Sequence, residues 1–292
     1  MVLLLANHFL QAAVFTIPQG GILVQIEGDG LRMSFQDARG RTLMPASGIA
    51  GGFLNGSPLS IERQLDRNTF QLVSKKGESA KLHISEANGR TAITVSPRNP
   101  PAHDAPHIIS LQFGGMPVAY GLGDVGGWNE TLNLVNETET TYPLTHNGGR
   151  FRWLSSFVIF PKNHIAGVTF DGIATSVTLG KNCYKTSVET SGAATFYFLS
   201  APPETIYANY QSLLREKGFP IIKPKFRLFE LGWESWAALG WQTNSRTMLD
   251  SIRQFQNMGY PIRWAVSGSG ILMDISEEWE SGKTYLPQIT KN

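Results

Sequence analysis

The stretch 223-KPKFRLFELGWESWAALGWQTNSRTMLDSIRQFQNMGYPIRWAVSGSG-270 contains two short apolar runs with an amphipathic segment between them. The runs Phe226–Trp233 and Ile262–Val266 are rich in aromatic and aliphatic residues, which is typical of parallel strands covered on both faces. Between them, Met248, Ile252 and Phe255 recur at the spacing of one helix face. The stretch therefore predicts a strand, a helix and a second, parallel strand.

The predicted helix has signals at both ends. Ser245 or Thr247 is expected to cap its first N–H groups, with Asp250 in the first turn, and Gly259 followed by Pro261 is expected to end it. Such a unit suits a (β/α) barrel or an open α/β sheet. In both folds ligands bind at the carboxyl ends of the strands, here residues 233–241 and 267–270.

Residues 17–199 have a different sequence pattern, in which short runs of alternating polarity are separated by Gly, Pro, Asn and Asp turns. This pattern predicts an antiparallel all-β domain, a large sandwich. Asp37–Gly40 and Asn88-Gly89 are expected to reverse hairpins, since Gly and Asn tolerate positive φ. Ser96–Pro106, with four prolines, is expected to be an exposed connection.

The sequence pattern changes again near residue 201. A helical stripe over residues 203–217 is followed by a proline-containing strap, and no further βα pattern follows residue 270. The expected domains are a β-sandwich at 1–201, a helical linker at 202–225, and the truncated start of a barrel with an irregular tail at 226–292.

Composition excludes few function classes. The 292 residues carry 25 Lys and Arg against 23 Asp and Glu, which leaves no basic surplus for nucleic acid. No apolar run is long enough to span a bilayer. Cys183 is the single cysteine, and the six histidines show no metal-ligand spacing on a helix, so neither a metal nor a cofactor is predicted.

The motif Gly121-Leu122-Gly123-Asp124-Val125-Gly126 matches the dinucleotide fingerprint G-x-G-x-x-G. That fingerprint requires a helix after the glycines, whereas residues 128–141 are rich in Asn, Thr and Glu and lack helical periodicity. The glycines instead favour a tight loop between strands.

Read as Ala119-Tyr120-Gly121-Leu122-Gly123-Asp124, the same residues resemble the Tyr-Gly-Leu-Gly-Glu signature in the N-terminal β-sandwich of glycoside hydrolase family 31, the α-glucosidase and α-xylosidase family. The run 129–141 before Tyr142-Pro143 is similar to that family's Asn-rich loop. The helix 206–216, the strap 223–225 and residues 229–233 resemble the entry to its catalytic barrel. The resemblance covers about residues 20–268.

The resemblance implies a galactose-mutarotase-like β-sandwich followed by the first βαβ unit of an incomplete (β/α)8 barrel. It also implies a retaining α-glycosidase that hydrolyses O-glycosidic bonds with two aspartates on later barrel strands, past residue 292. No catalytic residue is then expected in this chain, which would be inactive alone. Two departures concern the substrate: Asp124 stands where the family has Glu, and residues 266–269 replace an Asp-x-Asp segment that helps hold the sugar.

The candidate substrate-binding residues gather at two places. Aromatic rings stack on the C–H faces of sugars while carboxylates accept hydroxyl protons. On this basis the candidates are Trp233, Glu234, Trp236 and Trp241 after the first strand, with Asp124 and Trp128 in the glycine-rich loop. Glu230 and Glu234 lie about 13 Å apart along one strand, too far for a glycosidase pair.

Two other functions stay open. The sandwich could be a non-catalytic module that binds carbohydrate or a partner protein. A sugar epimerase-like sandwich would instead need a histidine and a carboxylate facing one concave sheet. A carbohydrate is the expected ligand in each enzymatic reading, and oligomeric state is left open.

Overall fold

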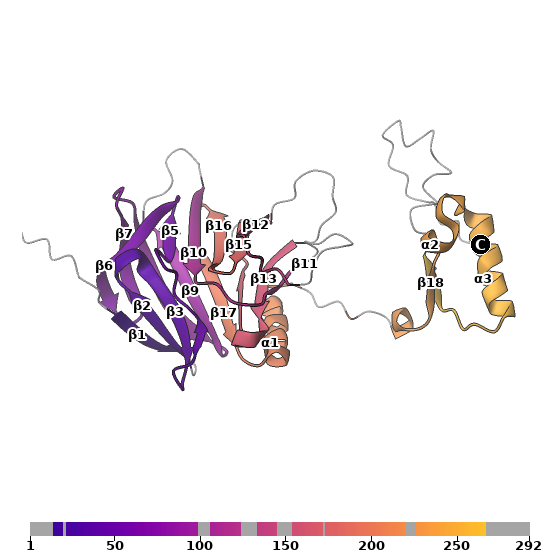
Figure 1. Cartoon of the computed structure of the whole chain (residues 1–292), viewed down its shortest axis with the longest axis horizontal. Coiled ribbons are helices and arrows are strands. Elements are labelled where there is room, and N and C mark those ends of the chain that lie inside the picture. Colours follow the sequence, from indigo (N-terminus) through magenta and orange to yellow (C-terminus); the bar gives the residue numbers. More distant parts are fainter. Residues whose placement is uncertain are drawn as a thin grey trace, which may run out of the picture. The chain divides into compact units, whose positions relative to one another are not determined.

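The computed structural model describes residues 14–19, 22–98, 106–123, 133–144, 154–171, 173–219, 223 and 226–266. The chain divides into two compact units, residues 1–220 and 221–292 (Figure 1). No helix in the described part is long and apolar enough to cross a membrane.

The first unit is almost entirely antiparallel β-structure, as predicted. Its strands are β1 (Val14–Gln19), β2 (Ile22–Glu27), β3 (Arg32–Asp37), β4 (Thr42–Met44), β5 (Gly52–Leu54), β6 (Ser57–Asp66), β7 (Thr69–Ser74), β8 (Ser79–Ala87), β9 (Arg90–Pro97), β10 (His107–Phe113), β11 (Tyr120–Gly123), β12 (Thr140–Pro143), β13 (Leu154–Phe160), β14 (Ile165–Thr169), β15 (Ile173–Gly180), β16 (Cys183–Thr190) and β17 (Ala194–Ser200), with short 3-10 turns η1 (Asp29–Leu31) and η3 (Pro161–Asn163).

Most of these strands belong to one sheet that folds back on itself. Its order is β11-β13-β14-β17-β9-β8-β7-β6-β5-β10-β16-β15-β12, and β1-β2-β3-β4 form a second sheet. The long strand β6 pairs with β5 at one end and β7 along most of its length, with register shifts after Ile61 and Gln64. Such bulges bend and twist a strand. The change of partner from β5 to β7, between Pro58 and Leu59, is where one limb of the sheet passes into the other.

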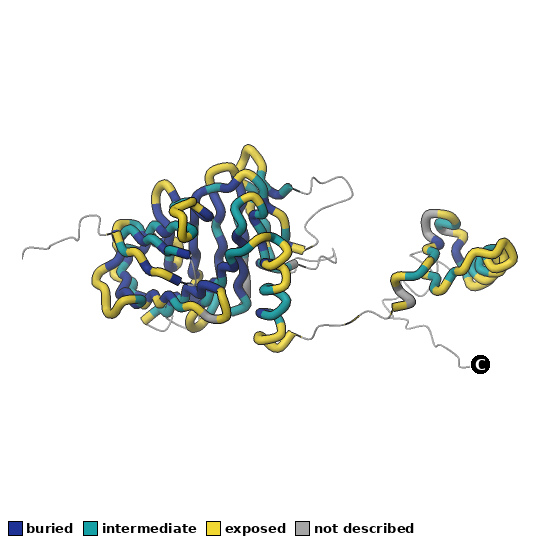
Figure 2. The backbone as a smooth tube through the Cα atoms, turned by 90° about the horizontal axis from the view of Figure 1, so that it is seen from below, coloured by how far each residue is buried: buried dark blue, intermediate teal, exposed yellow. Residues whose placement is uncertain are grey.

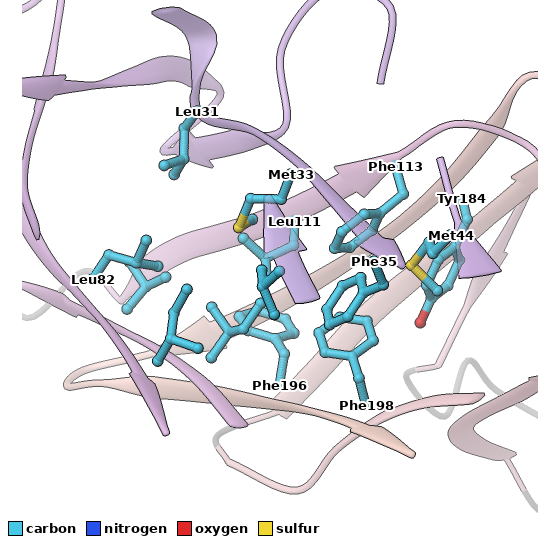
Figure 3. Packing of buried hydrophobic residues seen from close by; sticks show 14 of the residues in the cluster. Leu31, Met33, Phe35, Met44, Leu82, Leu111, Phe113, Tyr184, Phe196 and Phe198 are labelled. Atoms are coloured by element: carbon cyan, nitrogen blue, oxygen red, sulfur yellow. The ribbon is translucent and has the colours of Figure 1, made fainter. Parts of the chain in front are cut away.

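The two limbs enclose an aromatic core together with the smaller sheet (Figure 3). The Phe113 ring of β10 lies 5.3 Å from Phe198 of β17 and 5.7 Å from Phe35 of β3. Phe160 of β13 and Tyr184 of β16 pack edge to face at 5.0 Å. Since all five side chains are essentially inaccessible to solvent, this packing holds the sandwich together.

The predicted hairpin turns are confirmed. Asn88 and Gly89 join β8 to β9 with φ of 53° and 73°, the double left-handed conformation that an Asn-Gly hairpin favours. At the Asp37–Gly40 turn, the Asp37 carboxylate accepts hydrogen bonds from the backbone N–H groups of Arg39 and Arg41. Most of the Ser96–Pro106 connection lies outside the described residues.

The helix α1 (Pro203–Glu216) packs on the outward face of the sheet over β14 and β17. Its Ile206 and Leu213 are buried in one cluster with Val168 and Leu199. Figure 2 colours the backbone by burial and shows the helix mostly exposed or half-buried on the outside of the unit. The segment predicted as a linker thus contains a helix that belongs to the first unit. At the far end of α1, Glu216 forms an ion pair with the nearly inaccessible Arg90 of β9.

Replacing Glu216 by glutamine is expected to lower the free energy of unfolding by about 1–3 kcal/mol at neutral pH, because a buried guanidinium loses its anionic partner. The Arg90 hydrogen bond is the main cause of the lowered pKa of Glu216. A carboxyl whose pKa is lowered by folding adds stability above its ordinary value, near 4.5, and loses it as pH falls through the folded-state value.

Urea titrations of the native chain, the Glu216→Gln variant and the exposed control Glu86→Gln would measure this. The difference in unfolding free energy between the native chain and Glu216→Gln should decrease below about pH 4.5. A difference that stays constant with pH, or that Glu86→Gln reproduces, would contradict the ion-pair account.

The second unit contains one parallel βαβ arrangement. Its elements are η4 (Phe226–Phe229), β18 (Gly232–Glu234), α2 (Trp236–Leu239), η5 (Gly240–Gln242), α3 (Ser245–Asn257) and β19 (Trp264–Val266). Strands β18 and β19 pair in parallel, as predicted, with Gly232 opposite Trp264 and Glu234 opposite Val266.

Two local predictions for this unit are wrong. The expected strand Phe226–Trp233 begins as a 3-10 turn, whose Phe226 and Phe229 side chains are 80 and 74% exposed, because no neighbouring strand pairs with it in the described part. The helix is capped by Asn244 rather than Ser245 or Thr247, so Asp250 lies beyond the first turn.

Candidate functional site

The candidate site is built at the carboxyl end of β18. Glu234 is the last residue of this strand and its side chain is exposed. The next residue continues the parallel pairing, since the Ser235 N–H donates to the Val266 carbonyl at 3.0 Å. The backbone on either side of Glu234 in the sequence is therefore paired with β19, which fixes the position of this residue.

The loop after β18 is folded by a pair of buried hydroxyls. Ser235 and Thr243 are fully inaccessible, the Ser235 Oγ lies 3.4 Å from the Thr243 Oγ1, and Thr243 donates to the Gly240 carbonyl at 2.8 Å. These bonds draw the two ends of segment 236–242 together. The backbone thereby places Trp236 in α2 and Trp241 in η5, and both side chains lie outside what the structure describes.

The start of α3 is tied to the same loop. The Asn244 side chain accepts hydrogen bonds from the N–H groups of Arg246 and Thr247. In return, the Thr247 hydroxyl accepts a hydrogen bond from the Asn244 N–H. This reciprocal capping satisfies N–H groups that a helix start leaves unpaired. The Thr247 hydroxyl also lies 3.0 Å from the Gln242 carbonyl, so cap and loop form one hydrogen-bonded structure.

Trp233 faces α3. Its ring lies 5.5 Å from Phe255, which in turn packs edge to face with Tyr260. The side chain is half-buried in this contact. One side of the Trp233 ring is therefore covered by the packing of α3 on the strand.

Sequence analysis missed Trp264 on the opposite face of the β18–β19 pair. Its indole lies across Gly232, where a Cβ atom would come within 1.9 Å of the ring, and its Nε1–H donates to the Glu230 carbonyl at 3.1 Å. Glu230 itself is ion-paired with Arg263 at 3.4 Å. A glycine facing a tryptophan was the available signal, but it has meaning only once the strand register is known.

The other candidate residues belong to the first unit. Asp124 and Trp128 lie outside the described residues, which end at Gly123 in β11. Strand β11 pairs antiparallel with β13 and contains a bulge between Gly121 and Gly123, where the buried Leu122 has φ 61°. The first three residues of the G-x-G-x-x-G match are therefore in a bulged strand, and the other three lie outside the described residues.

The described residues contain no cluster of three or more His, Cys, Asp or Glu side chains that could hold a metal ion. Among them, the carboxyl end of β18 offers one exposed carboxylate, Glu234, and backbone-held tryptophans. This arrangement fits binding of a hydroxyl-bearing ligand better than two-carboxylate chemistry.

No family model matches the chain, and no curated protein matches it in sequence. Its structure is similar to the α-N-acetylgalactosaminidase NagBb from Bifidobacterium bifidum, with a TM-score of 0.51, 12% identity, and coverage of 84% of this chain and 50% of that one. A family 31 sulfoquinovosidase from E. rectale gives a TM-score of 0.48 at 9% identity, covering 79 and 39%. A family 31 α-xylosidase from a soil metagenome gives 0.38 at 13%, covering 85 and 39%.

The chain thus spans half or less of the length of these glycoside hydrolases. Two of these three neighbours are family 31 enzymes, the family whose motifs the sequence resembles. The likeness, which reaches a TM-score of 0.51 with the α-N-acetylgalactosaminidase, is one of fold alone. At such low identity the likeness carries no activity with it.

Proposed function

We propose that the chain is the N-terminal part of a retaining α-glycosidase that resembles glycoside hydrolase family 31 and hydrolyses O-glycosidic bonds in carbohydrates. In this proposal residues 1–201 form the sandwich domain, 202–225 connect it, and 226–292 begin a (β/α)8 barrel. The barrel is completed by βα units not contained in these 292 residues, and two aspartates on later strands carry the catalysis.

The observation that carries this proposal is the burial pattern of the second unit. Of its described apolar side chains none is buried, whereas the first unit has a large core. Phe226, Phe229 and Met258 are between 70 and 80% exposed. A parallel βα unit is normally covered by neighbouring strands and helices, and further barrel units would supply that cover.

The proposed roles of the site residues follow from their positions. Glu234, at the strand end, accepts hydrogen bonds from a sugar hydroxyl, and Trp236 and Trp241 in the loop after it provide apolar surface. Trp233 points to the other face of the strand and packs on Phe255 of α3, so it holds the strand end against the helix. Glu230, ion-paired to Arg263, stabilises the start of the barrel.

The 292-residue chain alone is expected to hydrolyse no aryl α-glycoside, because two carboxyl groups must flank the scissile bond at about 5–9.5 Å. Purified chain would be incubated with 4-nitrophenyl α-glucoside, α-xyloside and α-N-acetylgalactosaminide. Release of nitrophenol should equal the enzyme-free rate. Turnover that a Glu234→Gln change abolishes would overturn the assignment of catalysis to later strands.

A further inference from the structure

The outward face of strands β6 to β9 carries polar side chains in two adjacent rows. Leu82 of β8 points into the core (Figure 3), so its neighbours Lys81 and His83 face away from it. Strand register sets Gln71 opposite both Arg63 and Lys81, and Thr69 opposite both Asp66 and His83. We call these six residues the β6–β8 polar face.

An unsatisfied amide oxygen lies in the first row. Gln71 is 1% exposed, and its Nε2 donates to the Leu72 carbonyl, which fixes the orientation of the amide. Its Oε1 is buried and receives no hydrogen bond from the protein. A buried acceptor without a donor is costly, so this atom favours a ligand or solvent group that donates a proton.

The residues on either side of Gln71 are cations. Arg63 and Lys81 are both exposed, and neither forms a hydrogen bond or an ion pair within the described part of the chain. Arg63 and Lys81 thus lie on either side of the orphan acceptor, and Lys81, after the Asn68 N–H as the main cause, also contributes to the lowered pKa of Asp66. Cations in this position can receive an anionic group beside a hydroxyl donor.

The second row holds a hydrogen-bonded chain. The His83 Nδ1 lies 2.9 Å from the Thr69 Oγ1. The Asn68 N–H donates to the Asp66 carboxylate at 2.8 Å and is the main cause of the lowered pKa of Asp66. The His83 ring is exposed, so it is within reach of a ligand on this face.

We propose that the β6–β8 polar face binds an acidic saccharide, whose hydroxyls form hydrogen bonds with Gln71 and His83 and whose anionic group accepts from Arg63 and Lys81. Two cations against the single carboxylate of Asp66 leave the face net positive, which favours an anion over a neutral sugar. The proposal concerns the first unit and does not rest on the barrel assignment.

Titration calorimetry with sodium glucuronate, glucose and inorganic phosphate would test the site on the whole chain. Glucuronate should bind more tightly than either glucose, which lacks the anion, or phosphate, which lacks the sugar hydroxyls. Lys81→Met and Gln71→Met should each weaken glucuronate binding by about tenfold or more. The matched control Lys162→Met, in η3 on another part of the unit, should leave it unchanged.

Thermal unfolding supplies a second readout. Gln71→Met should raise Tm because it removes the orphan oxygen at nearly constant shape, while Lys81→Met should leave Tm unchanged. Absence of glucuronate binding, or equal binding of phosphate that survives Gln71→Met, would overturn the proposal. A lowered Tm in Gln71→Met with glucuronate binding intact would also overturn it, since the amide would then be satisfied by water.

Discussion

Replacing Gly121 by alanine is expected to destabilise the sandwich by about 3 kcal/mol or more, whereas the same change at Gly89 should cost only about 1 kcal/mol. Both glycines have positive φ, 131° and 73°. A Cβ at Gly121 would lie 2.2 Å from the Phe157 carbonyl oxygen, whereas at Gly89 it would meet nothing within 4 Å. The Gly89 variant gives the cost of a Cβ atom at an ordinary left-handed position, and the excess at Gly121 reports its larger φ together with the close approach of β11 to β13.

Urea unfolding monitored by fluorescence would measure both variants against the native chain. The expected order of stability is native, Gly89→Ala, Gly121→Ala. Equal destabilisation by the two changes would show that only backbone conformation matters at Gly121, and that the Tyr-Gly-Leu-Gly motif is not required for strand packing.

The sequence predicted the regular strands well because their alternation matches one buried face. The run Ile22–Glu27 coincides with β2, whose Ile22, Val24 and Ile26 are buried while the residues between them are half-exposed. Prediction of this kind needs only a period of two. The antiparallel domain and the two long helices were therefore recognisable from pattern alone.

Strands that break the period of two carry a weaker signal in the sequence. In β6 the bulges after Ile61 and Gln64 shift the inward positions, so no single alternation runs through the strand. In β16 the buried residues on one face are Tyr184, Thr186 and Val188, and the polar Thr186 interrupts the apolar pattern of that face. The return of one sheet on itself follows from the pairing of β6 with both β5 and β7, and could not be inferred from hydrophobic pattern.

At the candidate site, sequence located the strand end and the loop but not their internal bonds. Asn244 caps the helix although Ser245 was predicted, because both are good capping residues and stand one position apart. The contact of Trp264 with Gly232 and the burial of Ser235 with Thr243 depend on register and loop geometry. Neither leaves a periodic signal.

The second prediction with a large effect concerns the second unit, which has no buried apolar side chain among those described. Elements with few buried contacts open with free energies near zero, whereas core strands exchange only by near-global unfolding. The amides of β18, β19 and α3 should therefore show protection factors of about ten or less. Those of β8, β9 and β17 should exceed about a thousand.

Native-state hydrogen exchange of the whole chain, followed by mass spectrometry of peptides, tests the central claim most directly. The claim is that a complete sandwich is joined to the opening βαβ unit of an incomplete barrel. It predicts slow exchange in residues 79–97 and 194–200 and rapid exchange throughout 232–266. Equal protection in the two regions would show that the second unit is a complete domain, and would contradict the proposed barrel.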